Sequence, residues 1–152
     1  MDKVLRQDVY FTEPGKENTD DVVEAVLSRI EEVGVKAVVV ASNRGSTALK
    51  LGERLKGKAK VVSVSEYKYE SSVRKRLEDL KVVLVEECPI PVHDRKELRE
   101  ALYFFGQGLK VAVEVAAIAI CTDSQLFERV SGYANQQALC IVSKPQISRG
   151  IY

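Results

Sequence analysis

The loop over residues 42–47 holds the side chains that are best suited to bind an anion. It joins a buried apolar run to the start of a helical segment, which is where open α/β sheets bind their ligands. A helix start offers unpaired N–H groups and a positive dipole end, and the Arg44 guanidinium adds a forked charge that matches a phosphate. Gly45 would let the backbone come close to a ligand. The sequence therefore predicts an anion site formed by Ser42, Asn43, Arg44, Gly45, Ser46 and Thr47.

A second turn, over residues 14–19, also precedes a helical segment, and Lys16 gives it a positive charge. Because both segments lead into helices, each could supply N–H groups to one anion. We therefore expect a phosphate-bearing small molecule to bind between the two segments, with Arg44 and Lys16 as charge partners. The residues predicted to bind in this second turn are Pro14, Gly15, Lys16, Asn18 and Thr19.

A third candidate lies at the start of an apolar helical segment. We expect it to line the far side of the site, where Gln107 could contact a ring or a ribose. It is not a dinucleotide-binding fingerprint, because it lacks the third glycine and follows a helix rather than a strand. Its candidate residues are Gly106, Gln107, Gly108 and Lys110.

Two of these three segments also have a simpler interpretation. Ser46 could only cap its helix and Gly45 only turn the chain, while residues 106–110 could be an ordinary helix-entry turn. The first loop is not a P-loop, because no Gly-Lys-Ser/Thr follows at the required spacing. Tyr67 and Tyr69 could stack on a planar ring or lie at a sheet edge.

The composition limits the function further. The chain has 152 residues and a mass of 16.9 kDa, which is one domain over residues 1–152. Its net charge of +1 gives no electrostatic reason to bind nucleic acid or an anionic membrane. A single histidine and three widely spaced cysteines predict no metal site and a cytoplasmic location: His93, Cys88, Cys121 and Cys140. No signal peptide or membrane-spanning apolar run is found in the sequence.

The spacing of apolar residues predicts alternating helices and strands. The expected strands are β-branched runs without polar alternation, which is typical of parallel sheets buried on both faces. Their alternation with helices indicates right-handed crossovers and a doubly wound α/β sheet. Helices are expected at about residues 20–33, 47–56, 71–80, 95–105 and 109–120, and strands at 36–41, 61–64, 82–85 and 139–142.

Four segments together resemble a known family: residues 10–11, 14–19, 39–49 and 105–114. With them, most of the chain resembles a stand-alone, archaeal-type form of the pyruvate kinase C-terminal α/β domain. The resemblance implies a three-layer α/β/α fold with a mostly parallel five-stranded sheet of order 3-2-1-4-5, whose last strand is antiparallel. It also implies FMN or another phosphate-bearing ligand, because members of the stand-alone group are similar to flavin-nucleotide binders. In some pyruvate kinases the corresponding loop holds a sugar-phosphate effector.

Two segments depart from the family's pattern. Residues 132–137 have one glycine and no Asp, where the family has a glycine-rich loop with an Asp. Residues 126–130, the expected strand four, carry two charges. Because a buried unpaired charge is strongly unfavourable, we expect this strand to be frayed, shifted or at an edge.

The favoured function is therefore a non-catalytic protein that binds a phosphate-bearing small molecule. The alternatives are an interaction module without a ligand and a flavin-dependent oxidoreductase. Pyruvate kinase activity is not expected, because the catalytic barrel alone needs about 250 residues. Residues 103–105 and 109–120 carry more apolar surface than one sheet face covers, so we expect a homo-oligomer.

Overall fold

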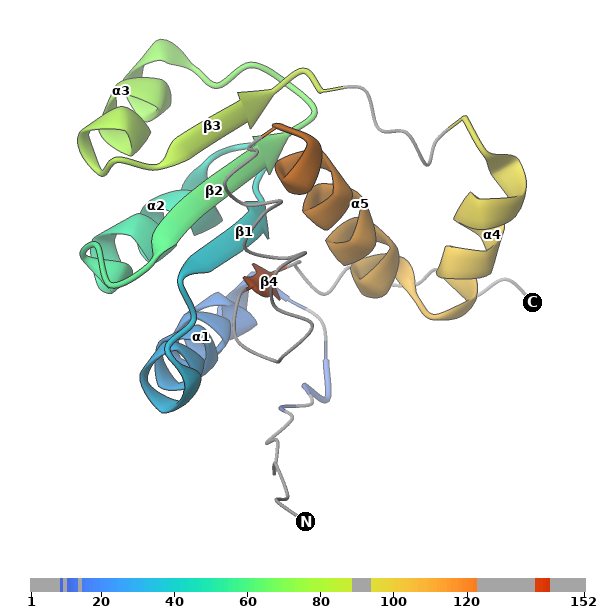
Figure 1. Cartoon of the computed structure of the whole chain (residues 1–152), viewed down its shortest axis with the longest axis horizontal. Coiled ribbons are helices and arrows are strands. Elements are labelled where there is room, and N and C mark those ends of the chain that lie inside the picture. The colour runs from blue at the N-terminus through green and yellow to red at the C-terminus, as the bar shows by residue number, and fades with distance from the viewer. Residues whose placement is uncertain (1–8, 10, 14, 89–93, 123–138, 143–152) are drawn as a thin grey trace.

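The computed structural model describes residues 9, 11–13, 15–88, 94–122 and 139–142, and it places helices on both sides of a parallel sheet (Figure 1). The helices are η1 (Lys16–Asn18), α1 (Thr19–Val33), α2 (Ser46–Leu55), α3 (Ser71–Asp79), α4 (Lys96–Phe104) and α5 (Gln107–Thr122). The strands are β1 (Ala37–Ala41), β2 (Lys60–Ser65), β3 (Val83–Glu86) and β4 (Leu139–Val142). The apolar spacing thus predicted every one of these elements except the short helix η1.

Strand β1 lies inside the sheet, whose described order is β3-β2-β1-β4 with parallel pairing throughout. Val39 of β1 pairs with Val62 of β2 on one side and with Ile141 of β4 on the other. Val38, Val39 and Val40 are fully buried. A run of β-branched residues is what a strand covered by helices on both faces requires.

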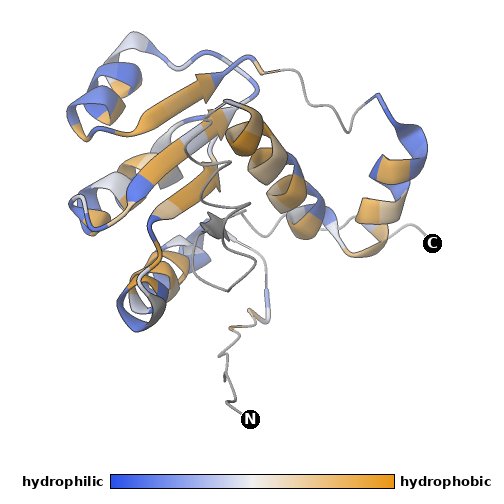
Figure 2. Cartoon of the chain, viewed as in Figure 1, coloured by the Kyte–Doolittle hydropathy of each residue, from blue (hydrophilic) through white to orange (hydrophobic). Residues whose placement is uncertain are grey.

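Alternate residues of the strands point into two separate cores. Val38 and Val40 pack with α1, α2 and α3 on one face of the sheet. Ala37 and Val39 pack with α5 on the other face. Figure 2 shows the strands and the middle of α5 in hydrophobic colours, with hydrophilic residues toward the outside of α1 and α3. The predicted α/β class, with helices on both faces of a parallel sheet, is therefore confirmed.

The five-strand order 3-2-1-4-5 is not confirmed. The resemblance implies that the last strand is antiparallel, but β4 runs parallel to β1 and is its direct neighbour. A parallel partner at this position completes the hydrogen bonding of β1, which would otherwise have an open apolar edge. The expected strand four at residues 126–130 and the loop at residues 132–137 lie outside the described residues.

Helix α1 ends at a glycine, whereas neither α1 nor α4 begins with a side-chain cap. Gly34, directly after Val33, is left-handed with φ 68° and donates its N–H to Ile30 O at 2.9 Å, which is a common way for a helix to end. Asn18 is at the N-cap position of α1, but its side chain forms no capping hydrogen bond; its Nδ2 donates to Glu13 O at 2.7 Å. Asp94 does not cap α4 either, since Arg95 occupies the N-cap position.

Three ion pairs connect α1 to α2 and to the turn that follows α2. Lys50 Nζ lies 2.6 Å from Asp20 Oδ1, Arg54 pairs with Glu24, and Lys58 Nζ lies 2.7 Å from Glu31 Oε1. The hydrogen bond from Lys58 lowers the pKa of Glu31. Exposed pairs of this kind add little stability. Their order nevertheless shows that the two helices run in the same direction, so that both begin at the carboxyl edge of the sheet.

Candidate functional site

The loops that follow β1 and β2 meet at the carboxyl edge of the sheet. Asn43 Oδ1 accepts a hydrogen bond from Glu66 N at 3.1 Å. Ser65 Oγ lies 3.5 Å from Asn43 O and accepts a bond from Tyr67 N at 3.1 Å. Asn43, which the sequence predicts as a ligand contact, therefore uses its side-chain oxygen to position the neighbouring loop.

Beneath these loops lies a buried polar network centred on Tyr69. Its hydroxyl lies 2.8 Å from Ser63 Oγ and donates to Ser42 O at 2.9 Å. Its backbone N–H donates to Glu86 Oε1 at 2.7 Å, and the other oxygen of Glu86 pairs with Arg74. The network connects the ends of β1, β2 and β3, so the edge that carries the candidate site is held in place by hydrogen bonds.

This network was not predicted, although the sequence contains a signal for it. Ser63 and Ser65 alternate with buried valines in β2, so both lie on the same face of the sheet. Two buried hydroxyls on one face need polar partners. Tyr69 supplies the partner for Ser63, in place of the ring contact or sheet-edge position expected for this tyrosine.

The stability of the protein is expected to fall above about pH 10 in part because of Tyr69. Burial raises the pKa of Tyr69 and the charge of Glu86 adds to the rise, against the hydrogen bonds with Ser63 and Ser65. The phenol of the unfolded chain therefore loses its proton first, which favours unfolding as the pH rises through the ordinary tyrosine pKa. Urea unfolding at pH values from about 8 to 11 should show a smaller alkaline loss in Tyr69→Phe than in the wild type.

Tyr67→Phe is the matched control, because this tyrosine is exposed. It should keep the wild-type dependence on pH. An unchanged alkaline loss in Tyr69→Phe would contradict this assignment.

The first turn of α2 has donors that no protein group accepts within the described residues. Its N-cap is Gly45, which has no side chain to cap it. Ser42 Oγ lies 3.4 Å from Ala48 N, but no acceptor is found for Ser46 N or Thr47 N in the described part of the chain. Thr47 is only 2% exposed, and its hydroxyl has no hydrogen-bond partner there.

The charges around this turn favour an anion. The first turn of α2 contains no acidic residue. Arg44, just before it, is exposed and forms no ion pair with any other described residue. Ser46 is also exposed. The predicted residues Arg44, Ser46 and Thr47 therefore lie together at one uncapped helix start.

Gly45 has a different role from the predicted one. Its φ is 74°, in the left-handed region, and a β-carbon there would clash with Val73 and contact Leu77 and Tyr69. The side of Gly45 that lacks a side chain thus faces α3 rather than a ligand. Glycine is needed here for the packing of two helices.

The turn over residues 15–19 is less favourable to an anion than the sequence suggests. Lys16 is exposed, but the Glu17 carboxylate lies over Gly15, where a β-carbon would clash with it. Asp20 adds a second carboxylate, which pairs with Lys50. Negative side chains therefore already lie near the start of α1. Pro14 is outside the described residues.

The segment over residues 106–110 begins α5, on the opposite face of the sheet from α2. Gly106 has a φ of 97° and forms the turn before α5, and Gln107 and Gly108 are the first residues of α5. Lys110 is 4% exposed, lies 2.7 Å from Glu114 Oε1 and has its ammonium 5.4 Å from the ring centre of Tyr103. Its charge is thus engaged inside the protein.

The described part of the chain contains neither a metal-binding cluster nor a membrane-spanning helix. No group of three or more His, Cys, Asp or Glu residues there could hold a metal ion. None of its helices is long and apolar enough to cross a membrane. Cys88 and Cys121 are free thiols.

The comparisons with known proteins add no assignment. No protein-family model matches the chain, and no curated protein matches it.

Proposed function

We propose that this protein binds a phosphate-bearing small molecule at the start of α2. The observation that carries the proposal is the hydroxyl of Thr47, which is buried without a hydrogen-bond partner among the described residues. An unsatisfied buried polar group costs about 1–3 kcal/mol. An anion bound at this helix start would accept hydrogen bonds from that hydroxyl and from the two adjacent N–H groups.

Arg44 supplies the charge that a phosphate needs. It lies one residue before the N-cap Gly45 of α2, and its guanidinium can form two parallel hydrogen bonds to phosphate oxygens. The positive end of the α2 dipole adds to its attraction. Because carboxylates lie at the start of α1, we assign the phosphate to α2 and leave Lys16 as a longer-range charge partner.

The part of the ligand beyond its phosphate group is proposed from the resemblance to the pyruvate kinase C-terminal domain. FMN, a nucleotide and a sugar phosphate all carry the required group, and the proposal covers these classes. A cytoplasmic location fits the free thiols of Cys88 and Cys121. An interaction module that binds no small molecule is the second candidate, favoured by the Glu17 carboxylate that lies over Gly15.

Calorimetric titration of inorganic phosphate, FMN, fructose bisphosphate and common nucleotides tests the proposal. Arg44→Ala should weaken binding of the phosphate ligand by roughly ten- to a hundred-fold, because it removes a charge-assisted hydrogen bond. Thr47→Val should weaken binding as well and at the same time raise the melting temperature, since it removes a buried hydroxyl that lacks a partner.

Arg54→Ala is the matched control. This arginine lies near the other end of α2 and pairs with Glu24, so its loss should leave binding unchanged. If no ligand binds the wild type below millimolar concentration, or if Arg44→Ala binds equally well, the protein is an interaction module.

A further inference from the structure

Strand β1, helix α2 and strand β2 form one βαβ unit, in which α2 connects two parallel neighbouring strands. From β1 the described sheet extends to β2 and β3 on one side and to β4 on the other. Open α/β sheets bind their ligands at such a switch in strand order. When the ligand is a nucleotide, the helix start takes the phosphate, and an acidic residue about 20 residues further on accepts a hydrogen bond from the ribose 2′-hydroxyl.

Glu66 has the position of that acidic residue. It directly follows β2 at the carboxyl edge of the sheet, and α2 begins about 20 residues before it, at Ser46. Its backbone is tied to the loop after β1, because Glu66 N donates to Asn43 Oδ1 at 3.1 Å. Asn43 in turn directly precedes Arg44. Glu66 and the start of α2 therefore lie at the same edge, at the ends of two adjacent strands.

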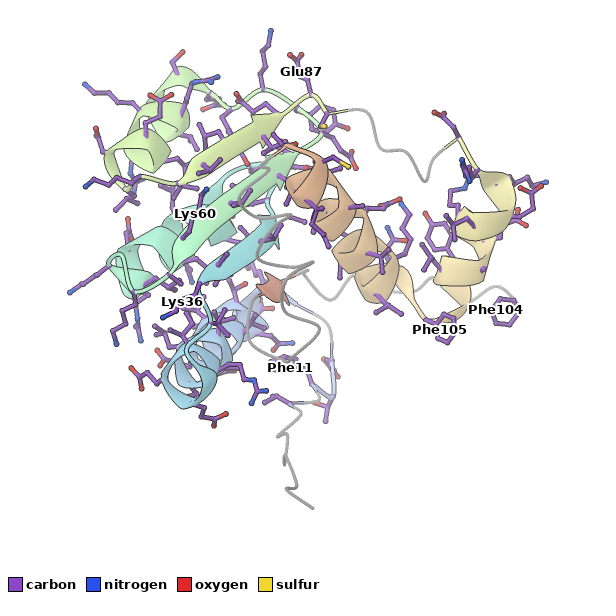
Figure 3. All side chains as sticks on the ribbon, viewed as in Figure 1. Phe11, Lys36, Lys60, Glu87, Phe104 and Phe105 are labelled. Carbon is purple, nitrogen blue, oxygen red and sulfur yellow. The ribbon has the colours of Figure 1, made fainter. Side chains whose placement is uncertain are left out.

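The carboxylate of Glu66 is available to a ligand. Its side chain is exposed and forms no ion pair with any other described residue. The acidic residues at the end of β3 are engaged, since Glu86 pairs with Arg74 and Glu87 Oε2 lies 3.3 Å from Lys68 Nζ. Figure 3 shows Glu87 beyond the end of β3, with its side chain pointing outward. A carboxylate repels a phosphate but accepts strong hydrogen bonds from hydroxyl groups, so Glu66 is suited to the sugar of a ligand.

We propose that the site at the start of α2 binds the ribose 5′-phosphate group of a nucleotide or of a free sugar phosphate, with Glu66 as the acceptor for the 2′-hydroxyl. The inference rests on the proposed phosphate site and adds the sugar to it. The phosphate binds at the start of α2 beside Arg44, and the ribose lies across the ends of β1 and β2. The loop after β1 has only Gly45 where the dinucleotide fingerprint has three glycines. We therefore assign a single phosphate rather than a pyrophosphate.

Calorimetric titration of paired ligands tests the proposal. Ribose 5-phosphate should bind the wild type roughly ten- to a hundred-fold more tightly than 2-deoxyribose 5-phosphate, because only ribose offers the 2-hydroxyl to a charged acceptor. Glu66→Ala should remove this difference, and it should fold normally because Glu66 is exposed. AMP and dAMP repeat the comparison with a base attached. The ribose compound that binds more tightly, AMP or ribose 5-phosphate, identifies a nucleotide or a free sugar phosphate as the source of the group.

Glu70→Ala is the matched control. This glutamate is also exposed, precedes α3 and forms no ion pair with another described residue, so its replacement should keep the difference between the paired ligands. If the wild type binds both members of each pair equally and Arg44→Ala weakens both, the ribose assignment is wrong and the phosphate site stands. The same holds if Glu66→Ala keeps the full difference. If no phosphate compound binds the wild type, the proposed function fails and this inference fails with it.

Discussion

Replacing Glu114 by alanine is expected to lower the free energy of unfolding by about 3–5 kcal/mol, the cost of breaking a buried ion pair. Lys110 and Glu114 are 4% and 3% exposed, and Lys110 Nζ lies 2.7 Å from Glu114 Oε1. Alanine at position 114 would leave the ammonium buried without this carboxylate. The loss is a large part of the stability of a domain this size. Urea unfolding of the variant and the wild type measures it.

The double variant Lys110→Met/Glu114→Leu is the control for this prediction. It removes both charges together and fills similar volume, so it should recover most of the lost stability. If Glu114→Ala is as stable as the wild type, the pair is not buried in solution and Lys110 returns as a candidate ligand contact.

The second large effect is expected at Gly45. Gly45→Ala should lower the free energy of unfolding by about 2–5 kcal/mol. A side chain in the left-handed region contributes roughly 1–2 kcal/mol of this loss, and overpacking against α3 contributes roughly 1–3 kcal/mol. A β-carbon at this position would clash with Val73. Thermal and urea unfolding should both show the loss.

Two further variants separate the two causes. Gly57 is also left-handed, with φ 81°, but has no atom near its absent β-carbon, so Gly57→Ala should show only the backbone cost. In a Val73→Ala background, Gly45→Ala should cost less than in the wild type, because the clashing methyl group is gone. Equal costs at Gly45 and Gly57 would mean that the contact with α3 does not matter.

Local patterns predicted most of the fold. The β-branched runs of β1, β2 and β3 and the apolar stripe of α1 identify their elements, because each pattern has one period and one buried side. The strand neighbours could not be read in this way. Which strand pairs with β1 depends on contacts between distant segments. The strand at Leu139–Val142, which the family resemblance implies to be antiparallel, runs parallel to β1.

The candidate site was also predicted only as far as local patterns reach. A loop between a strand and a helix, with Arg44 and two hydroxyls, can be recognised locally, and the structure places Arg44, Ser46 and Thr47 at one helix start. The neighbour of Gly45 comes from another helix, and no local pattern shows that Val73 of α3 fills the space beside it. The pair of Lys110 and Glu114 has the i,i+4 spacing of neighbours on one helix, but its burial depends on contacts with the rest of the chain.

The position of β1 also has a consequence for synthesis. Its partner on one side, β2, follows after one helix, but its partner on the other side, β4, follows about a hundred residues later. At a ribosomal rate of about 5–20 residues per second, the strand Leu139–Val142 is made roughly 5–20 s after β1. During that interval the nascent chain carries an apolar strand with one vacant edge, the kind of edge that pairs with other chains.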